Sequence, residues 1–174
     1  MSSRDFDHTV LPHLDAAFNY ARWLTRNDAD AEDVVQDACV RAIRFLPSLR
    51  HQDARAWLMA IVRNAWYSRV ARRASLSEVA STEEPAMEPA DSALDPEALL
   101  LQQHAVTQVR EAIEQLPVDF REVLVLREIE GFSYKGIAEV IRIPIGTVMS
   151  RLARARARLS TMLKKPSLQL EDTP

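Results

Sequence analysis

The segment at residues 74–100 constrains the fold more than any other feature of this 174-residue sequence. It contains seven acidic residues and three prolines, few large apolar residues, and no lysine or arginine. A stretch of this composition cannot bury enough surface to offset the entropy lost on ordering. We therefore expect an acidic flexible linker between two small units, residues 1–73 and 101–165, with a C-terminal tail at 166–174.

The net charge of −3 is an average over three unlike parts of the chain. Residues 1–73 and 101–174 each carry a net charge of +2, whereas the linker carries −7. Residues 55–73 and 142–165 contain five and seven basic residues respectively and no acidic ones. Two basic surfaces joined by an acidic segment favour bivalent contact with a polyanion, with ordinary solvated helix faces as the alternative.

Composition predicts an all-α protein and disfavours several other classes. Scarce glycine and abundant alanine, leucine, glutamate and arginine favour helices, and the three glycines stand too far apart for a phosphate-binding loop. The single cysteine, Cys39, excludes a disulfide framework, and four scattered histidines form no metal-ligand cluster. We therefore expect no cofactor, no metal and no catalytic activity. The sequence shows no pattern typical of a signal peptide or a membrane span, which predicts a cytoplasmic protein without membrane insertion.

The first unit contains three helical patterns, at residues 8–25, 31–45 and 55–73. Asp28 or Asp30 is expected to cap the second helix, whose apolar side consists of Val34, Val35, Ala38, Ala42, Phe45 and Leu46. The opposite side mixes charged and apolar residues, as a protein-binding face would, but periodicity alone favours a merely solvated face. Its residues are Asp33, Gln36, Asp37, Val40 and Arg44.

The helix at residues 55–73 has one apolar half and one small, polar half. The apolar half consists of Trp57, Leu58, Ile61, Val62, Ala65 and Trp66. On the other half, Arg63, Asn64 and Tyr67 stand beside Ala56 and Ala60, so an unstacked base could approach closely. The two tryptophans are more readily explained as core residues, whereas Tyr67 suits either role.

The second unit is predicted to contain a helix-turn-helix. A helix at about 99–116 precedes Pro117, and the next helix ends at Gly131. Ser133 caps a short helix at 134–141, a turn follows, and a basic helix spans about 147–163. One side of this last helix is apolar, and the opposite side carries hydroxyls and arginines that suit a DNA major groove.

Four sequence blocks resemble the extracytoplasmic-function (group IV) sigma factors of bacterial RNA polymerase. These blocks occur in the family's order around the acidic linker, and the likeness is strongest in the turn and the basic helix. They are Asp30–Asp37, Ala56–Asn64, Leu116–Val123 and Ile143–Leu152. The resemblance implies a region 2 helical bundle at 1–73, a region 4 helix-turn-helix at 101–165, and promoter-specific initiation with core polymerase.

The resemblance also implies roles for individual residues. Asp33, Gln36, Asp37, Val40 and Arg44 would bind the β′ clamp helices, and region 4 would meet the β flap. The minus-ten element would be bound by Ser48, Leu49, Arg50, His51, Gln52, Asp53, Arg63, Asn64 and Tyr67. The minus-thirty-five element would be bound by Thr147, Met149, Ser150, Arg151, Arg154 and Arg158. Many members of the family also bind an anti-sigma factor, which no residue of this chain identifies.

Three residues depart from the family pattern. Gly136 replaces a usual glutamate and removes the capping-box partner of Ser133. Arg142 replaces a usual glycine, at a cost of about 1 kcal/mol if its φ is positive. Met149 replaces a frequent lysine or arginine and so alters the minus-thirty-five contact. The alternative functions are a stand-alone helix-turn-helix regulator, which would leave the first unit idle, and an enzyme.

Overall fold

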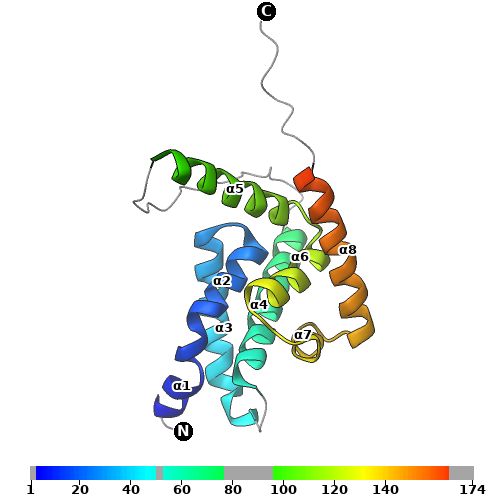
Figure 1. Ribbon diagram of the computed structural model, residues 1–174. Helices are drawn as coiled ribbons and strands as arrows, with labels where there is room; N and C mark the ends of the chain where they lie inside the picture. Colours follow the sequence, from blue (N-terminus) through cyan, green and yellow to red (C-terminus); the bar gives the residue numbers. More distant parts are fainter. Residues whose placement is uncertain (1–2, 50–52, 77–95, 165–174) are drawn as a thin grey trace, which may run out of the picture.

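The computed structural model describes residues 3–49, 53–76 and 96–164, which form helices and turns without any strand. The first unit consists of α1 (Ser3–Thr9), α2 (Leu14–Thr25), α3 (Asp28–Phe45) and α4 (Ala54–Leu76). The second consists of α5 (Pro96–Glu114), α6 (Val118–Leu124), α7 (Tyr134–Ile141) and α8 (Ile145–Lys164) (Figure 1). The expected all-α architecture with two helical units is confirmed. None of these helices is long and apolar enough to cross a membrane.

The first helix and the edges of the linker differ from expectation. The helix expected at 8–25 is broken by a 3-10 turn at Leu11–His13, where Pro12 lacks the amide hydrogen that a continuous helix requires. Residues 74–76 belong to α4, and α5 begins at Pro96, three residues before the expected start. The remainder of the expected linker, 77–95, and the expected tail at 166–174 lie outside the described residues.

Asn27, rather than Asp28 or Asp30, caps α3. Its side-chain oxygen accepts a hydrogen bond from the amide of Asp30 at 3.0 Å, which satisfies one of the unpaired amides at the start of the helix. The two aspartates lie instead in the first turn, where negative charge is favourable. At the other end of α3, Phe45 is 51% exposed rather than buried.

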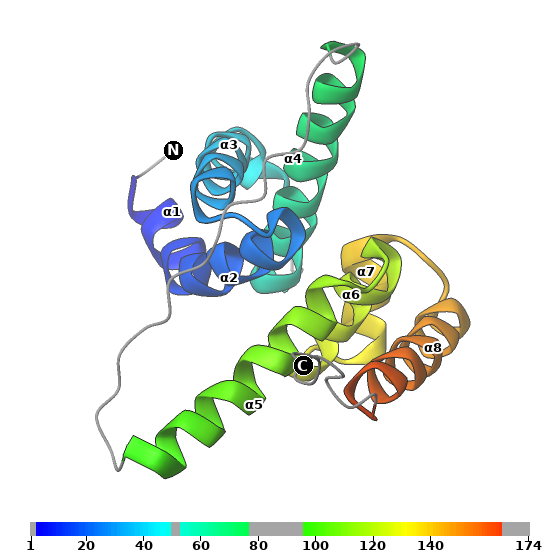
Figure 2. The same cartoon turned by 90° about the horizontal axis from the view of Figure 1, so that it is seen from above.

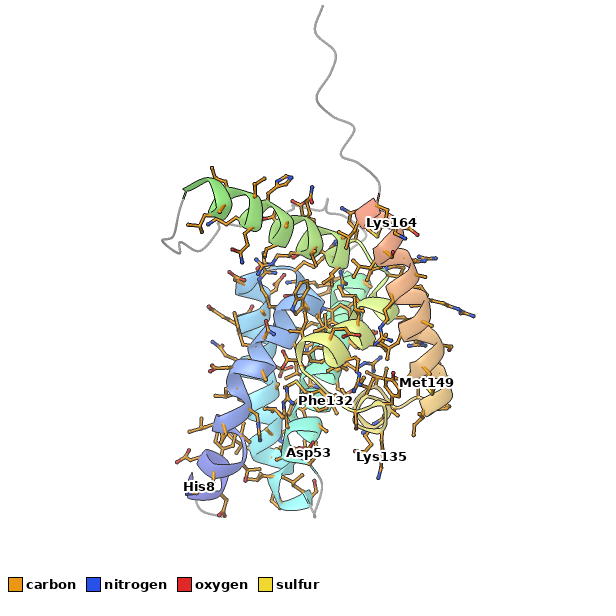
Figure 3. The ribbon with its side chains drawn as sticks, in the orientation of Figure 1. His8, Asp53, Phe132, Lys135, Met149 and Lys164 are labelled. Atoms are coloured by element: carbon orange, nitrogen blue, oxygen red, sulfur yellow. The ribbon has the colours of Figure 1, made fainter. Side chains whose placement is uncertain are left out.

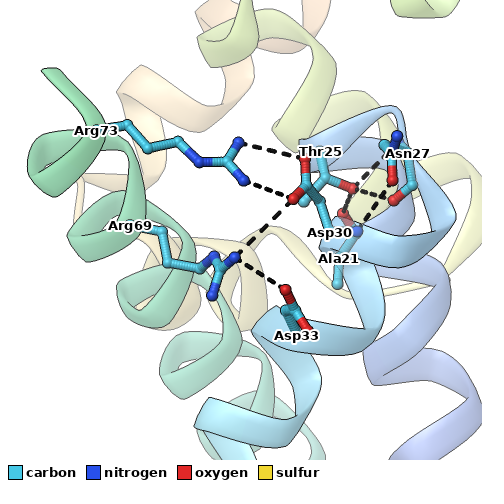
Figure 4. Close-up of polar contacts among 7 residues, drawn as sticks. All are labelled: Ala21, Thr25, Asn27, Asp30, Asp33, Arg69 and Arg73. Carbon is cyan, nitrogen blue, oxygen red and sulfur yellow. Dashed lines mark hydrogen bonds and ion pairs between the residues drawn. The ribbon is translucent and has the colours of Figure 1, made fainter. Parts of the chain in front are cut away.

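Ion pairs connect the start of α3 to the end of α4 (Figure 4). Arg73 donates hydrogen bonds to both carboxylate oxygens of Asp30, at 2.6 and 3.2 Å, and Arg69 donates to Asp33 at 3.1 Å. The hydrogen bonds from Arg73 lower the pKa of Asp30 below its ordinary value. These exposed ion pairs add to the direct packing of α3 against α4.

The helix-turn-helix is present at the expected residues. Ser133 caps α7 by accepting a hydrogen bond from the amide of Gly136 at 3.0 Å. Gly131, with φ of 71°, follows a π-helical turn at Val125–Ile129 and ends that helical segment as expected. Arg142 ends α7 in the left-handed conformation, with φ of 56°, so the strain expected for a non-glycine residue is present.

The two units pack together around one continuous hydrophobic core. α4 packs against α7, and α2 packs against α6, whereas the N-terminal half of α5 extends away from the body (Figure 2). Buried residues of the core come from both sides of this contact, including Leu58 and Val62 of α4 and Ile137 of α7. Sequence periodicity had not indicated that the units touch.

Arg142→Gly is expected to raise the free energy of unfolding by about 1 kcal/mol, because glycine adopts a positive φ without the steric cost of a Cβ. Urea unfolding of the two proteins measures the difference. Arg142→Ala is the control, since it removes the guanidinium but keeps the Cβ. An equal gain in both variants would contradict the explanation from backbone strain.

Asp30→Asn is expected to destabilise the protein by no more than about 1 kcal/mol at pH 7, as is typical of exposed ion pairs. Because the folded-state pKa of Asp30 is lowered, its carboxylate contributes stability above the ordinary aspartate pKa of about 3.9, and that contribution disappears as the pH falls through the folded-state value. The difference between wild type and variant should therefore shrink on acidification. Urea titrations at neutral and acidic pH test this, and a difference independent of pH would refute it.

Candidate nucleic-acid interface

The exposed side of α3 carries the residues expected to bind a protein partner. Val40 is 57% exposed, and Ile43, one turn away, is 49% exposed. Polar residues surround these two side chains. Gln36 and Arg44 are also exposed, and Asp37 is half-buried, with its carboxylate 2.9 Å from the guanidinium of Arg41. We call the residues Asp33, Gln36, Asp37, Val40, Ile43 and Arg44 the α3 face. Asp33 is the one member engaged within the chain by α4, through Arg69.

The helix α4 is covered on both sides. Its expected apolar half is buried at Leu58, Ile61, Val62 and Ala65, with Trp57 and Trp66 half-buried against the core. On the other half, Ala56 is only 5% exposed, and the side chain of Arg63 is 19% exposed. Tyr67 is half-buried, whereas Asn64 is exposed. The surface expected to receive single-stranded DNA is therefore not open in this structure, because the second unit packs against α4.

Arg63 forms a buried ion pair with Glu122 of α6. The guanidinium donates two hydrogen bonds to the carboxylate, from Nε at 2.8 Å and from Nη2 at 3.0 Å, and the Glu122 side chain is completely buried. The hydroxyl of Tyr20, from α2, donates a third, longer hydrogen bond to Glu122 at 3.4 Å. Arg63 also lies over the ring of Tyr67, at 4.5 Å from its centroid. One carboxylate of the second unit thus holds side chains from two helices of the first.

Glu130 forms a second polar contact between the units. Arg55 donates hydrogen bonds to the Glu130 carboxylate at 3.0 Å and to its backbone carbonyl at 2.5 Å, and Asn19 donates to the same carboxylate at 2.6 Å. The guanidinium of Arg55 also lies 4.4 Å from the ring centroid of Phe132, which Figure 3 places between the two units. We call Asn19, Tyr20, Arg55, Arg63, Glu122, Glu130 and Phe132 the inter-unit interface.

Burial and the charge of Glu122 fix the protonation of its partners. Burial alone would lower the pKa of Arg63, but the hydrogen bonds and charge of Glu122 outweigh it and hold this pKa above its ordinary value. Burial, and then the charge of Glu122, raises the pKa of Tyr20 well above its ordinary value. The same two causes raise the pKa of Tyr67. At neutral pH the arginine is therefore a cation, and the phenol of Tyr20 keeps the proton that it donates.

The segment between α3 and α4 is only partly described. A 3-10 turn at Leu46–Ser48 replaces the expected loop, and the Ser48 hydroxyl donates to the carbonyl of Phe45 at 2.6 Å. Leu49 is half-buried, and the Asp53 carboxylate accepts from the amide of Arg55 at 2.9 Å. The other three residues expected to bind the minus-ten element here, Arg50, His51 and Gln52, lie outside the described residues.

The outward side of α8 carries the residues expected to bind the minus-thirty-five element. Met149 is 52% exposed at the N-terminal end of the helix (Figure 3). Ser150 and Arg154 are also exposed, and Arg154 forms no ion pair with any described residue. Arg151 is half-buried at 3.8 Å from Asp119. The two remaining residues are Thr147, which is half-buried, and Arg158, which is exposed and lies over the ring of Phe120.

Sequence reasoning missed the acidic residues of the inter-unit interface. Glu122 lies one turn from Val118 and one turn from Leu126, so it interrupts an apolar stripe that continues from α6 into the π-helical turn after it. A carboxylate at such a position requires a buried partner. Arg63, next to Ala60 on a helix side free of acidic residues, is a suitable partner, but the sequence alone could not select it among the many arginines.

Two family models match the chain in order. Sigma-70 region 2 matches residues 9–76, and Sigma-70 region 4 matches residues 107–159. The RNA polymerase sigma-H factor of Pseudomonas aeruginosa is 34% identical over 169 residues, covering 92% of this chain and 87% of that protein. The ECF RNA polymerase sigma factor SigE of Mycolicibacterium smegmatis is 32% identical over 162 residues. This alignment covers 93% of this chain but only 63% of SigE.

Solved structures give the same result. The sigma factor RpoE of Bartonella quintana, in complex with the anti-sigma factor NepR, aligns with a TM-score of 0.77 at 32% identity, covering 94% of this chain and 99% of that one. CnrH, in complex with the cytosolic domain of CnrY, aligns with a TM-score of 0.67 at 28% identity, covering 95% of this chain and 92% of CnrH. A stand-alone helix-turn-helix regulator does not account for the match to region 2. This chain therefore belongs to the extracytoplasmic-function sigma factors of RNA polymerase.

Proposed function

We propose that this sigma factor binds core RNA polymerase through the α3 face and binds promoter DNA through α4 and α8. The exposure of Val40 and Ile43 among polar residues of the α3 face carries the proposal, because aliphatic side chains held at the surface of a well-packed helix favour a protein partner. The family assigns this helix to the β′ clamp helices and region 4 to the β flap.

The promoter contacts of α8 are assigned from charge and exposure, and those of α4 from the chemistry of its side chains. The outward side of α8 presents hydroxyls and arginines in the pattern that suits a major groove, with Ser150 near the N-terminal end and Arg154 one turn later. On α4, Arg63, Asn64 and Tyr67 provide a cation, an amide and an aromatic ring for an unstacked strand. We assign the minus-thirty-five element to α8 and the minus-ten element to α4 and the segment before it.

In this proposal the chain acts by binding, and the polymerase forms the bonds. Its place of action is then the cytoplasm, where transcription occurs. Because RpoE was solved in complex with the anti-sigma factor NepR, we infer that a protein of this class also regulates this chain. Run-off transcription with core enzyme on a genomic DNA library tests the proposal, since it reports both activity and promoter sequence. Failure to redirect initiation would overturn it.

Val40→Glu is expected to weaken binding to core polymerase about tenfold or more, because it places a charge in the apolar part of the α3 face, and tenfold corresponds to about 1.4 kcal/mol. Titration of labelled sigma factor with core enzyme measures the affinity. Leu11→Glu is the control, since it puts the same charge on an aliphatic side chain that is 47% exposed and lies outside both the α3 face and region 4. Equal affinities for the two variants would argue against the α3 face as the docking surface.

Arg154→Ala is expected to weaken promoter binding by about 1–3 kcal/mol when the upstream element is intact, because a contact to a base edge is lost. Arg156→Ala is the matched control on the same helix, since Arg156 is paired with Glu128 and lies outside the proposed DNA side. The effect is measured by the run-off yield on a promoter that the genomic-library experiment identifies, with its upstream element intact or scrambled. A loss that persists on the scrambled promoter would refute the assignment of Arg154.

A further inference from the structure

Two apolar side chains are exposed at the N-terminal end of α8. Ile145, the first residue of the helix, is 45% exposed, and Met149 is 52% exposed. They are four residues apart and therefore neighbours on the helix surface, whereas Val148, next to Met149, is completely buried. The N-terminal residues of a recognition helix are the ones that contact base edges in the major groove. The exposed apolar surface thus lies where the sequence of the DNA would be read.

The polar side chains around this surface are partly engaged within the protein. The hydroxyl of Ser150 donates a hydrogen bond to the backbone carbonyl of Thr147 at 3.1 Å. Arg151, the first cation along α8, is half-buried, and its guanidinium lies 3.8 Å from the carboxylate of Asp119. Arg154, in the following turn, is exposed. The start of α8 therefore presents apolar surface to DNA, and the exposed arginine comes only in the next turn.

The chemistry of the Met149 side chain restricts what it can contact in DNA. A thioether carries no charge and no donor, so it neither pairs with a phosphate nor donates to the O6 and N7 acceptors of guanine. The apolar group that base pairs present in the major groove is the C5-methyl group of thymine. A flexible, unbranched thioether adapts well to such a group, and their contact removes apolar surface from water.

We propose that Met149, with Ile145 beside it, contacts the C5-methyl group of a thymine in the minus-thirty-five element and sets the base preference at that position. This inference rests on the proposed function, because that function assigns α8 to this element. Arg154 supplies a hydrogen-bonded contact to the same element, and Met149 supplies a contact without hydrogen bonds. Because the two contacts differ in chemistry, each is removed without removing the other.

Varying the bases of the upstream element shows which base each protein prefers. A pool of promoters with a randomised upstream element and a transcribed barcode is used for run-off transcription, and the transcripts are sequenced. The wild type should prefer thymine at the contacted position, and Met149→Leu should keep this preference because leucine is apolar and similar in volume. Met149→Lys should prefer guanine there, because an ammonium donates to O6 and N7. An unchanged thymine preference in Met149→Lys would overturn the proposal.

Replacing thymine by uracil tests the methyl contact directly, because it removes the methyl group and keeps every hydrogen-bonding group. Each thymine of the element is replaced in turn, and fluorescence anisotropy measures the affinity of the holoenzyme for the promoter duplex. At the contacted thymine the wild type should bind about fourfold more weakly, which corresponds to one buried methylene-sized group. Met149→Ala should bind both duplexes equally.

Leu163→Ala is the matched control for the loss of apolar surface. It truncates an aliphatic side chain that is 43% exposed near the opposite end of α8, away from the residues that would contact the element. This variant should keep the fourfold response to uracil. Loss of the response in Leu163→Ala as well as in Met149→Ala would overturn the assignment to Met149.

The same measurements separate this contact from the proposed function. If uracil has the same effect in the wild type and in Met149→Ala at every thymine, the methyl contact is overturned. Dependence of promoter binding on Arg154 in that assay would leave the proposed function intact. Weaker binding of Met149→Ala to core polymerase, with an unchanged response to uracil, would assign the methionine to the polymerase and overturn the contact. Failure of the wild type to redirect initiation would overturn both.

Discussion

The buried ion pair between Arg63 and Glu122 determines how the two halves of the molecule fit together. Removing both charges from water is costly, and the cost is offset only where geometry and hydrogen bonding are good. Here both conditions hold, because two nitrogen atoms of Arg63 reach the carboxylate and Tyr20 supplies a third donor. A shift of α6 along α4 would leave a charge buried without its partner, so the pair fixes the register of the second unit.

Polar and apolar contacts together join the two units, because the ion pairs lie beside the shared hydrophobic core. The hydrogen bonds between the units are made by Asn19, Arg55 and Arg63 with Glu122 and Glu130, groups that water or a phosphate can satisfy equally well. Buried apolar side chains on both sides of the contact, such as Leu58, Val62 and Ile137, hold the units together by removing their surface from water. The ion pairs therefore specify the geometry in which this apolar surface is buried.

Local features were predictable from the sequence, and contacts between distant segments were not. The short helix after Ser133 and the left-handed Arg142 followed from capping and from the residue expected in that turn, which depend on neighbours in the chain. The cap of α3 was misassigned to aspartates because Asn27 and Asp28 are both suitable residues and only geometry selects between them. The covering of Arg63 depends on packing between segments 59 residues apart, for which helical periodicity contains no information.

The departure at Gly136 acquires a physical meaning from its neighbours. A Cβ at this position would lie 3.2 Å from the Phe132 ring and 3.3 Å from the Ser133 hydroxyl, closer than side chains normally approach. A glutamate here would complete the capping box of Ser133, but it would also press on the ring against which Arg55 stacks. Glycine gives up the additional cap and leaves Phe132 in contact with the first unit. One residue of the helix-turn-helix thus connects the capping of α7 to the packing of the two units.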